Sequence, residues 1–260
     1  MKIRKIINKN LSDNLWLKKE REKTKPLFIL ASGPSLKDCD VTKLKNCYTM
    51  SFNRSYIAFN DWGFEPTYFA GLDHVVNADN KEEYRKLIDS SKIERFFFSE
   101  DKISKEYLSS KKTSIVEIEE GDPTHPNLNF KNKLVVSNSG LFGLQVAIGL
   151  LNFREIYLLG CDANYQETVK GVKLVNGTYV SQSNSDPNHF RKDYYGTGRT
   201  YNKPGSLIWH LPAWKWFWKT YIANNDKIKV YNCSKIGKLK FFEFRDFDEV
   251  VQDINRYEKL

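Results

Sequence analysis

The sequence predicts an α/β protein: a single doubly wound, Rossmann-like domain with a mainly parallel sheet and an inserted lid. Short apolar runs alternate with helical patterns along most of the chain. Several of these runs end on a small or polar residue, as strands that end at a ligand crevice do. Residues 163–206 lose the alternation and become rich in Asn, Ser, Gly and Tyr, which indicates the lid.

The first half of the chain predicts four strands. Residues 26–31 form an apolar run that stops at a Gly turn, and residues 47–53 and 67–73 repeat the pattern. A helix is expected over 82–88, followed by a buried strand over 95–99. Apolar runs without alternation are typical of parallel strands that are covered on both faces.

The clearest unit spans residues 138–162. A mostly apolar helix follows the polar start at 138–140, and a short loop leads into a buried strand over 156–162. Helix, loop and buried strand make half of a βαβ unit. Beyond the lid, a Trp-rich helix over 209–218 and a last strand over 228–233 complete the domain of residues 26–260.

Four predicted strands end on a small or polar side chain: Ser32, Asn53, Asp73 and Asp162. The carboxyl ends of parallel strands lie at one edge of a sheet, where open α/β sheets bind ligands. We therefore expect these four residues to converge on one site.

Two helix starts favour an anionic ligand. Ser32-Gly33-Pro34-Ser35 lacks both the Gly-Lys-Ser/Thr ending of a P-loop and the three glycines of a dinucleotide fingerprint. Gly33 still permits close backbone approach, and Ser35 is expected to cap a helix whose N–H groups face an anion; a plain capped turn is the alternative. Asn138-Ser139-Gly140 offers the same choice between a cap and a carboxylate or phosphate site.

The remaining candidates are a carboxylate, a histidine and two tyrosines. Asp162 is expected either to accept hydrogen bonds from sugar hydroxyls or to cap a turn, and with Asp73 it offers too few ligands for a metal. His189 suits a general base acting on a sugar hydroxyl, against the alternative of a loop histidine. Tyr194 and Tyr195 are expected to donate hydrogen bonds to a departing phosphate.

Charge and composition narrow the class of protein. Nine Lys and Arg against three Asp and Glu in residues 1–25 supply most of the formal net charge of +9, so a nucleic-acid partner is not expected. The apolar residues of that segment recur at near-helical spacing, which favours either an amphipathic helix on an anionic membrane or an ordinary surface helix. Four scattered cysteines and the lack of a long apolar run suggest a cytoplasmic location, peripheral on the membrane in the first alternative.

Several of these segments resemble bacterial sialyltransferases of the Campylobacter type, a glycosyltransferase family 42-like group. The similar segments are residues 29–37, Phe52-Asn53-Arg54, residues 137–140 and residues 155–162. The loop at 33–36 and the Gly160-Cys161-Asp162 strand end also resemble a broader group that includes motility accessory factors and pterin pyrophosphokinase-like proteins. Departures are Ser32 and Ala163, where the family has an asparagine and an aromatic, and Asp193-Tyr194-Tyr195 in place of a second histidine.

The resemblance implies an inverting, metal-independent and cofactor-free transfer of sialic acid, a related nonulosonic acid or Kdo from its CMP donor to a glycan hydroxyl. By position, Ser32, Gly33 and Asn53 would contact the nucleotide, Ser139 and Gly140 the phosphate or carboxylate, and Gly160 and Asp162 the cytidine. His189 would be the base.

The expected acceptor is an oligosaccharide or glycolipid of lipopolysaccharide or capsule biosynthesis, and a homo-oligomer stays open. Two other hypotheses are a Mg-dependent pyrophosphokinase or phosphotransferase on the same fold and a non-catalytic nucleotide-binding protein.

Overall fold

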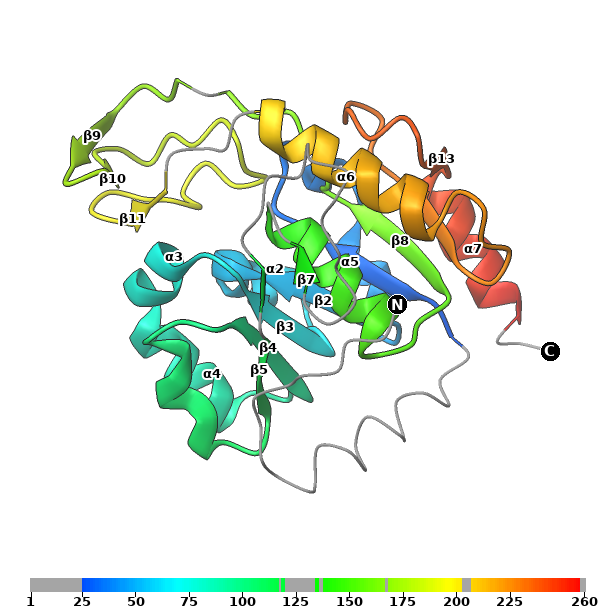
Figure 1. The fold of residues 1–260 in the computed structure, drawn as a ribbon, viewed down its shortest axis with the longest axis horizontal. Helices are drawn as coiled ribbons and strands as arrows, with labels where there is room; N and C mark the ends of the chain where they lie inside the picture. The colour runs from blue at the N-terminus through cyan, green and yellow to red at the C-terminus, as the bar shows by residue number, and fades with distance from the viewer. Residues whose placement is uncertain are drawn as a thin grey trace.

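The computed structural model describes residues 25–116, 118–119, 134–135, 138–166, 168–202 and 207–257. Its centre is an eight-stranded sheet in the order β13-β12-β8-β1-β2-β3-β4-β5, in which every neighbouring pair is parallel (Figure 1). The strands are β1 (Leu27–Leu30), β2 (Tyr48–Phe52), β3 (Tyr68–Gly71), β4 (Arg95–Ser99), β5 (Thr113–Val116), β8 (Glu155–Leu159), β12 (Lys229–Asn232) and β13 (Glu243–Phe244).

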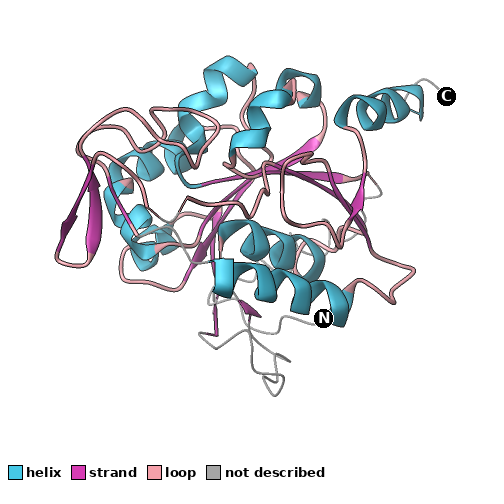
Figure 2. Ribbon diagram, turned by 90° about the horizontal axis from the view of Figure 1, so that it is seen from above, coloured by secondary structure: helices cyan, strands magenta, loops and turns pink. Residues whose placement is uncertain are grey.

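Helices cover both faces of this sheet (Figure 2). α5 (Ser139–Gly149) and α6 (Leu207–Tyr221) pack on one face, and α4 (Lys81–Ser90) and α7 (Phe247–Tyr257) on the other. β1 alternates between the two cores, because successive side chains of a strand point to opposite faces. Leu27 and Ile29 lie in the first core and Phe28 and Leu30 in the second.

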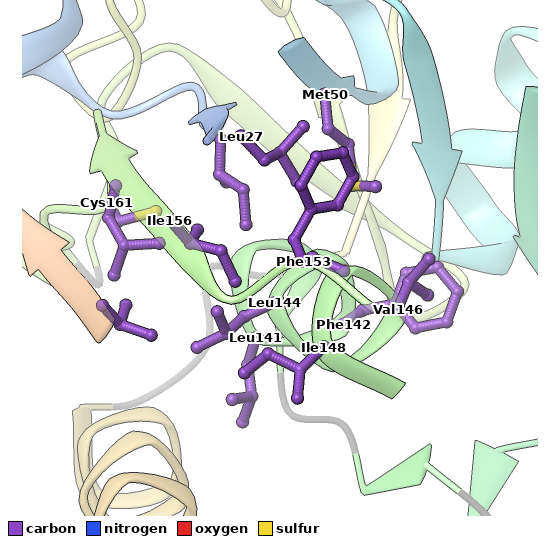
Figure 3. Packing of buried hydrophobic residues seen from close by; sticks show 14 of the residues in the cluster. Leu27, Met50, Leu141, Phe142, Leu144, Val146, Ile148, Phe153, Ile156 and Cys161 are labelled. Atoms are coloured by element: carbon purple, nitrogen blue, oxygen red, sulfur yellow. The ribbon is translucent and has the colours of Figure 1, made fainter. Parts of the chain in front are cut away.

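α5 is buried along almost its whole length. Its apolar side chains, with Leu144 among them, face residues of β1, β2 and β8 such as Leu27, Met50 and Ile156 (Figure 3). At Gly143 the chain has no room for a side chain, because an added Cβ would collide with the Phe52 ring and lie 3.1 Å from the Met50 sulfur. The close approach of α5 to β2 fixes where the helix begins relative to the strand ends.

Short elements fill the connections. They are the 3₁₀ helices η1 (Pro34–Asp38), η2 (Val41–Leu44), η3 (Asn53–Ala58) and η4 (Ser104–Ser109), the helices α2 (Phe59–Trp62) and α3 (His74–Asp79), and the parallel pair β6 (Ile118–Glu119) and β7 (Leu134–Val135). The predicted lid holds a three-stranded antiparallel sheet of β9 (Val172–Val175), β10 (Thr178–Ser181) and β11 (Thr200–Tyr201). It projects at one end of the molecule, beside α3 (Figure 1).

The predicted α/β fold, its parallel sheet and its layers of helices are confirmed. Each strand and helix predicted for residues 26–260 is present within a few residues. The elements that were not expected are β5, β6, β7, β9, β10, β11, β13, α2, α3 and α7. Among the described residues, no helix is long and apolar enough to span a bilayer. The basic segment 1–25 lies, apart from Lys25, outside the described residues, so the membrane-binding helix stays a prediction.

Candidate active site

The strand order places a crevice between β1 and β8. From β1 the chain adds β2 to β5 on one side, then returns to add β8 on the other. The loops after β1 and β8 diverge from such a reversal point, and the space between them is the usual ligand site of this architecture. Here the loops meet at their base, where the Gly33 N–H donates to the Gly160 carbonyl at 2.9 Å. A Cβ on Gly33 would lie 2.7 Å from an Asp162 carboxylate oxygen, so only glycine fits.

Asp162 holds these loops together. It is 4% exposed, and its carboxylate accepts hydrogen bonds from the Ser35 N–H at 2.8 Å, the Ser35 hydroxyl and the Ser234 hydroxyl at 2.6 Å. Ser234 follows β12, so one carboxylate joins the loops of three strands.

This arrangement corrects three predictions. Ser35 does not cap a helix: η1 is a five-residue 3₁₀ helix preceded by Gly33, and no side chain caps it. The anion at that helix start is the protein's own Asp162. Asp162, Ser35 and Pro34, which were expected to contact a ligand, do not line the cavity described next, and Asp162 and Ser35 are hydrogen-bonded to each other instead.

A cavity of about 390 Å³ occupies the crevice. It is lined by most of the residues singled out in the sequence, namely Ser32, Gly33, Asn53, Asp73, Asn138, Ser139, Gly140, Gly160, His189 and Tyr195. Three of the four strand-end residues therefore converge on one space with the lid, whereas Asp162 does not line it.

One wall of the cavity is formed by the start of α5 and the end of β2. Asn138 is the N-cap, since its side chain accepts from the Leu141 N–H at 2.9 Å. The Asn53 amide donates to the Ser139 hydroxyl at 3.1 Å. Asn53 has a left-handed φ of 51°, and its Oδ1 is buried with no partner among the described residues. Because a buried acceptor without a partner is costly, this oxygen is a natural contact point for a ligand.

Asp73 reaches the same cavity from the end of β3. Its Oδ1 caps α3 by accepting from the Val75 N–H at 2.8 Å, and it also accepts from the Asn202 side chain at 2.8 Å. Asp73 thus ties the end of the lid to the edge of the cavity.

His189 enters from the lid and is paired with a carboxylate. Its Nδ1 lies 2.8 Å from Asp186 Oδ2, and their side chains are only 14% and 8% exposed. A carboxylate can only accept, so Nδ1 donates, and the neutral imidazole then has its lone pair on Nε2. Asp186 itself is fixed by the backbone N–H groups of Asn188 and Tyr195. This carboxylate was not expected from the sequence, although it stands three residues before His189.

The side chains of the adjacent Tyr194 and Tyr195 lie in different environments. Tyr195 lines the cavity, and burial raises its pKa well above the usual value, so the phenol remains a donor. Tyr194 is fully buried and does not line the cavity. The expectation that Tyr194 donates to a departing phosphate is therefore wrong: its hydroxyl donates to the Phe52 carbonyl at 3.3 Å, and its ring stacks on His189.

The cavity is also lined by residues that sequence reasoning missed. His210 and Trp214, one turn apart on α6, line it together with Tyr165, whose ring meets the His210 ring edge-on at 5.6 Å. Burial lowers the pKa of His210 to about 4, so its imidazole is uncharged at neutral pH. Across the described residues, no group of three His, Cys, Asp or Glu side chains is placed to hold a metal ion.

Comparison with known proteins finds solved structures of similar fold. The MAf glycosyltransferase from Magnetospirillum magneticum AMB-1 is 16% identical with a TM-score of 0.49, and the match covers 86% of this chain and 34% of that one. The chain therefore spans about a third of that protein's length.

The sialyltransferase CstII from Campylobacter jejuni, in complex with a substrate analogue, cytidine-5'-monophosphate, is 17% identical with a TM-score of 0.48, over 86% of this chain and 85% of that one. A CST-II structure with trisaccharide acceptor and CMP is 19% identical with a TM-score of 0.47, over 84% and 85% of the two chains. No protein-family model and no curated protein matches the chain.

We predict that Asp162→Asn lowers the free energy of unfolding by about 2 to 3 kcal/mol, because the amide nitrogen cannot accept from the buried donors. Urea unfolding followed by circular dichroism measures the change. Ser234→Ala, which removes one donor from the same carboxylate, is the matched control and should cost about 1 kcal/mol. An Asp162→Asn protein as stable as the wild type would show that the carboxylate does not hold the loops.

His210 should make stability depend on pH. Its native pKa of about 4 lies below the ordinary value of 6.5, so between these values the unfolded chain binds the proton and the native protein does not. Stability is therefore full above pH 6.5 and falls as the pH drops toward 4. The wild type should lose about 2 to 3 kcal/mol more than His210→Phe between pH 7 and pH 4.5, measured by urea unfolding. Parallel stability curves for the two proteins would contradict this.

Proposed function

We propose that this protein is a glycosyltransferase that moves an acidic sugar from a CMP-activated donor to a hydroxyl of a glycan, with inversion and without a metal. The observation on which the proposal depends is the buried His189–Asp186 pair, which faces the cavity at the reversal point of the sheet. The sequence resemblance supports a CMP ester of sialic acid, another nonulosonic acid or Kdo as the donor.

The pair is suited to a general base. With Nδ1–H held by Asp186, the Nε2 lone pair accepts the proton of the acceptor hydroxyl as its oxygen attacks the anomeric carbon. The new C–O bond forms as the bond to the phosphate oxygen breaks, and the electron pair leaves with CMP. The Asp186 carboxylate stabilises the imidazolium that results.

Another part of the cavity lining suits the leaving nucleotide. The start of α5 opens onto the cavity, and its N–H groups and dipole favour an anion there. Asn53 Oδ1 and the Tyr195 hydroxyl add an acceptor and a donor on the adjoining walls. Such fixed dipoles stabilise charge that develops on a departing phosphate. We assign the acceptor, a surface oligosaccharide or glycolipid, to the part of the cavity beside His189, because the base must reach the acceptor hydroxyl.

The donor class is tested by thermal shift with CMP, CDP, UDP, GDP and ATP, each with Mg²⁺ and with excess chelator. CMP at about a hundredfold over its Kd should raise the Tm by about 5 °C with the chelator present, because a ligand that binds only the native state stabilises it. A shift by ATP that needs Mg²⁺, with none by CMP, would instead support a phosphotransferase and overturn the proposal.

The base is tested by His189→Ala. We expect kcat for transfer from a CMP-sugar to fall by a factor of about 10² to 10⁴, the usual contribution of general base catalysis. The thermal shift by CMP should persist in the variant, which controls for folding and donor binding. Transfer within a few-fold of the wild-type rate would exclude His189 as the base, and CMP binding without turnover of any donor by the wild type would favour a non-catalytic nucleotide-binding protein.

A further inference from the structure

A buried arginine, Arg54, contacts Tyr194, the lid residue whose ring stacks on His189. Arg54 is 6% exposed, and none of the described acidic residues forms an ion pair with it. Its guanidinium instead donates to the Tyr194 carbonyl through Nε and to the Asn80 side-chain oxygen at 3.0 Å. Burying a charge without a carboxylate partner is costly, so these hydrogen bonds must hold the group firmly.

The main body supports the guanidinium from below. Tyr56 accepts from it at 3.2 Å, and the Tyr56 hydroxyl donates to the same Asn80 oxygen at 2.6 Å. The Asn80 amide in turn donates to the Val76 carbonyl of α3 at 2.6 Å. The side chain of Arg54 is therefore fixed to α3 and η3 at one end and to the lid at the other.

Tyr194 transmits this placement to His189. Its hydroxyl accepts a hydrogen bond from the Arg54 backbone N–H at 3.1 Å. Arg54 therefore binds both the hydroxyl and the backbone carbonyl of Tyr194. The Tyr194 ring lies parallel to the His189 ring, with centroids 4.2 Å apart and an interplanar angle of 2°. Tyr195 packs edge-on against the same imidazole at 5.0 Å. The plane of the imidazole is thus set by Tyr194, and its rotation within that plane by Asp186.

The backbone explains why neighbouring residues serve different parts of the site. The left-handed φ of 51° at Asn53 turns the chain sharply after β2. Asn53 then faces the cavity, while Arg54 lies outside the cavity lining and reaches Tyr194 in the lid. The end of β2 contributes to the cavity wall and to the support of the proposed base through consecutive side chains.

We infer that Arg54 is a positioning residue for His189, acting through Tyr194 to keep the imidazole in line with Asp186 and the acceptor hydroxyl. The catalytic consequence rests on the proposed function, whereas the effect on the imidazole does not. Without the guanidinium, the Tyr194 carbonyl loses its hydrogen bond and the stacked rings of Tyr194 and His189 shift. The hydrogen bond from His189 Nδ1 to Asp186 then loses its alignment.

The test compares Arg54→Met, Arg54→Lys and the control Arg199→Met. Arg199 also ties the lid to the main body, through Glu83 at 2.7 Å and the Asp79 carbonyl at 3.2 Å, but it touches neither Tyr194 nor His189. Arg54→Met should lower kcat about 10- to 100-fold with the donor KM within threefold, since a small misplacement of a reacting group has effects of this size. The kcat of Arg54→Lys should lie between those of Arg54→Met and the wild type, and the kcat of Arg199→Met should stay within threefold of the wild type.

The second readout follows the imidazole itself. NMR of ¹⁵N-histidine-labelled protein above pH 7, with the His189 signal assigned by its loss in His189→Ala, should show one neutral tautomer protonated on Nδ1 in the wild type and in Arg199→Met. Arg54→Met should show a mixture of tautomers. If Arg54→Met does not fold, the His189 signal is measured in Arg54→Lys instead. This variant keeps the charge but lacks the Nε donor.

An unchanged His189 signal in folded Arg54→Met, or in Arg54→Lys where Met does not fold, overturns the inference whatever the transfer rate. Failure of the proposed function is a separate result. In that case His189→Ala retains transfer, or no CMP-sugar is used, while the NMR signal still reports whether Arg54 positions the imidazole.

Discussion

The buried carboxylate of Asp162 is the interaction on which the site depends. It is hydrogen-bonded to the loops after β1 and β12 while itself following β8, so it fixes the relative positions of three neighbouring strand ends. The Lys238 N–H also donates to the Asp162 carbonyl at 2.8 Å, which attaches the segment leading to β13. The cavity lies beside this junction and is lined by the β1 loop, the start of α5 and the lid.

The lid is held against the main body by several hydrogen bonds. The Phe190 N–H donates to the Ser32 carbonyl at 2.9 Å, directly beside His189. Thr200 and Asn202 are bound by Asp79 and Asp73, which belong to α3 and its N-cap. The proposed base therefore sits on a long connection but inherits its position from the sheet and from α3, and this suits a group that must be placed accurately against a substrate.

The sequence predicted the parallel sheet well, because continuous apolar runs such as 26–31 and 95–99 are conspicuous. It also brought Ser32, Asn53 and Asp73 to one edge, since strand polarity alone places them there. The direction of Asp162 was beyond sequence reasoning. Gly160 adopts a left-handed φ of 65°, and that turn sends the carboxylate into the protein instead of the crevice.

The directions in which adjacent side chains point were still harder to predict from the sequence. Tyr194 and Tyr195 are identical in type, and only the packing of the lid sends one behind His189 and the other into the cavity. His210 was missed because α6 is apolar on nearly every side, so no polar face marked the cavity. α7 was also missed, although its apolar Phe247, Val250 and Val251 stand at helical spacing in the sequence.

The sheet's strand order also has a consequence for how the chain acquires its structure. β1, at the centre, is made first, yet one of its two edges pairs with β8, where Leu27 lies opposite Ile156. On the ribosome, the growing polypeptide can assemble β1 to β5 while that edge still awaits its neighbour. Closing so large a loop is slow, and an uncovered edge in a nascent chain invites pairing with other chains. The crevice that holds the candidate site lies between β1 and β8, so it is among the last features of the chain to form.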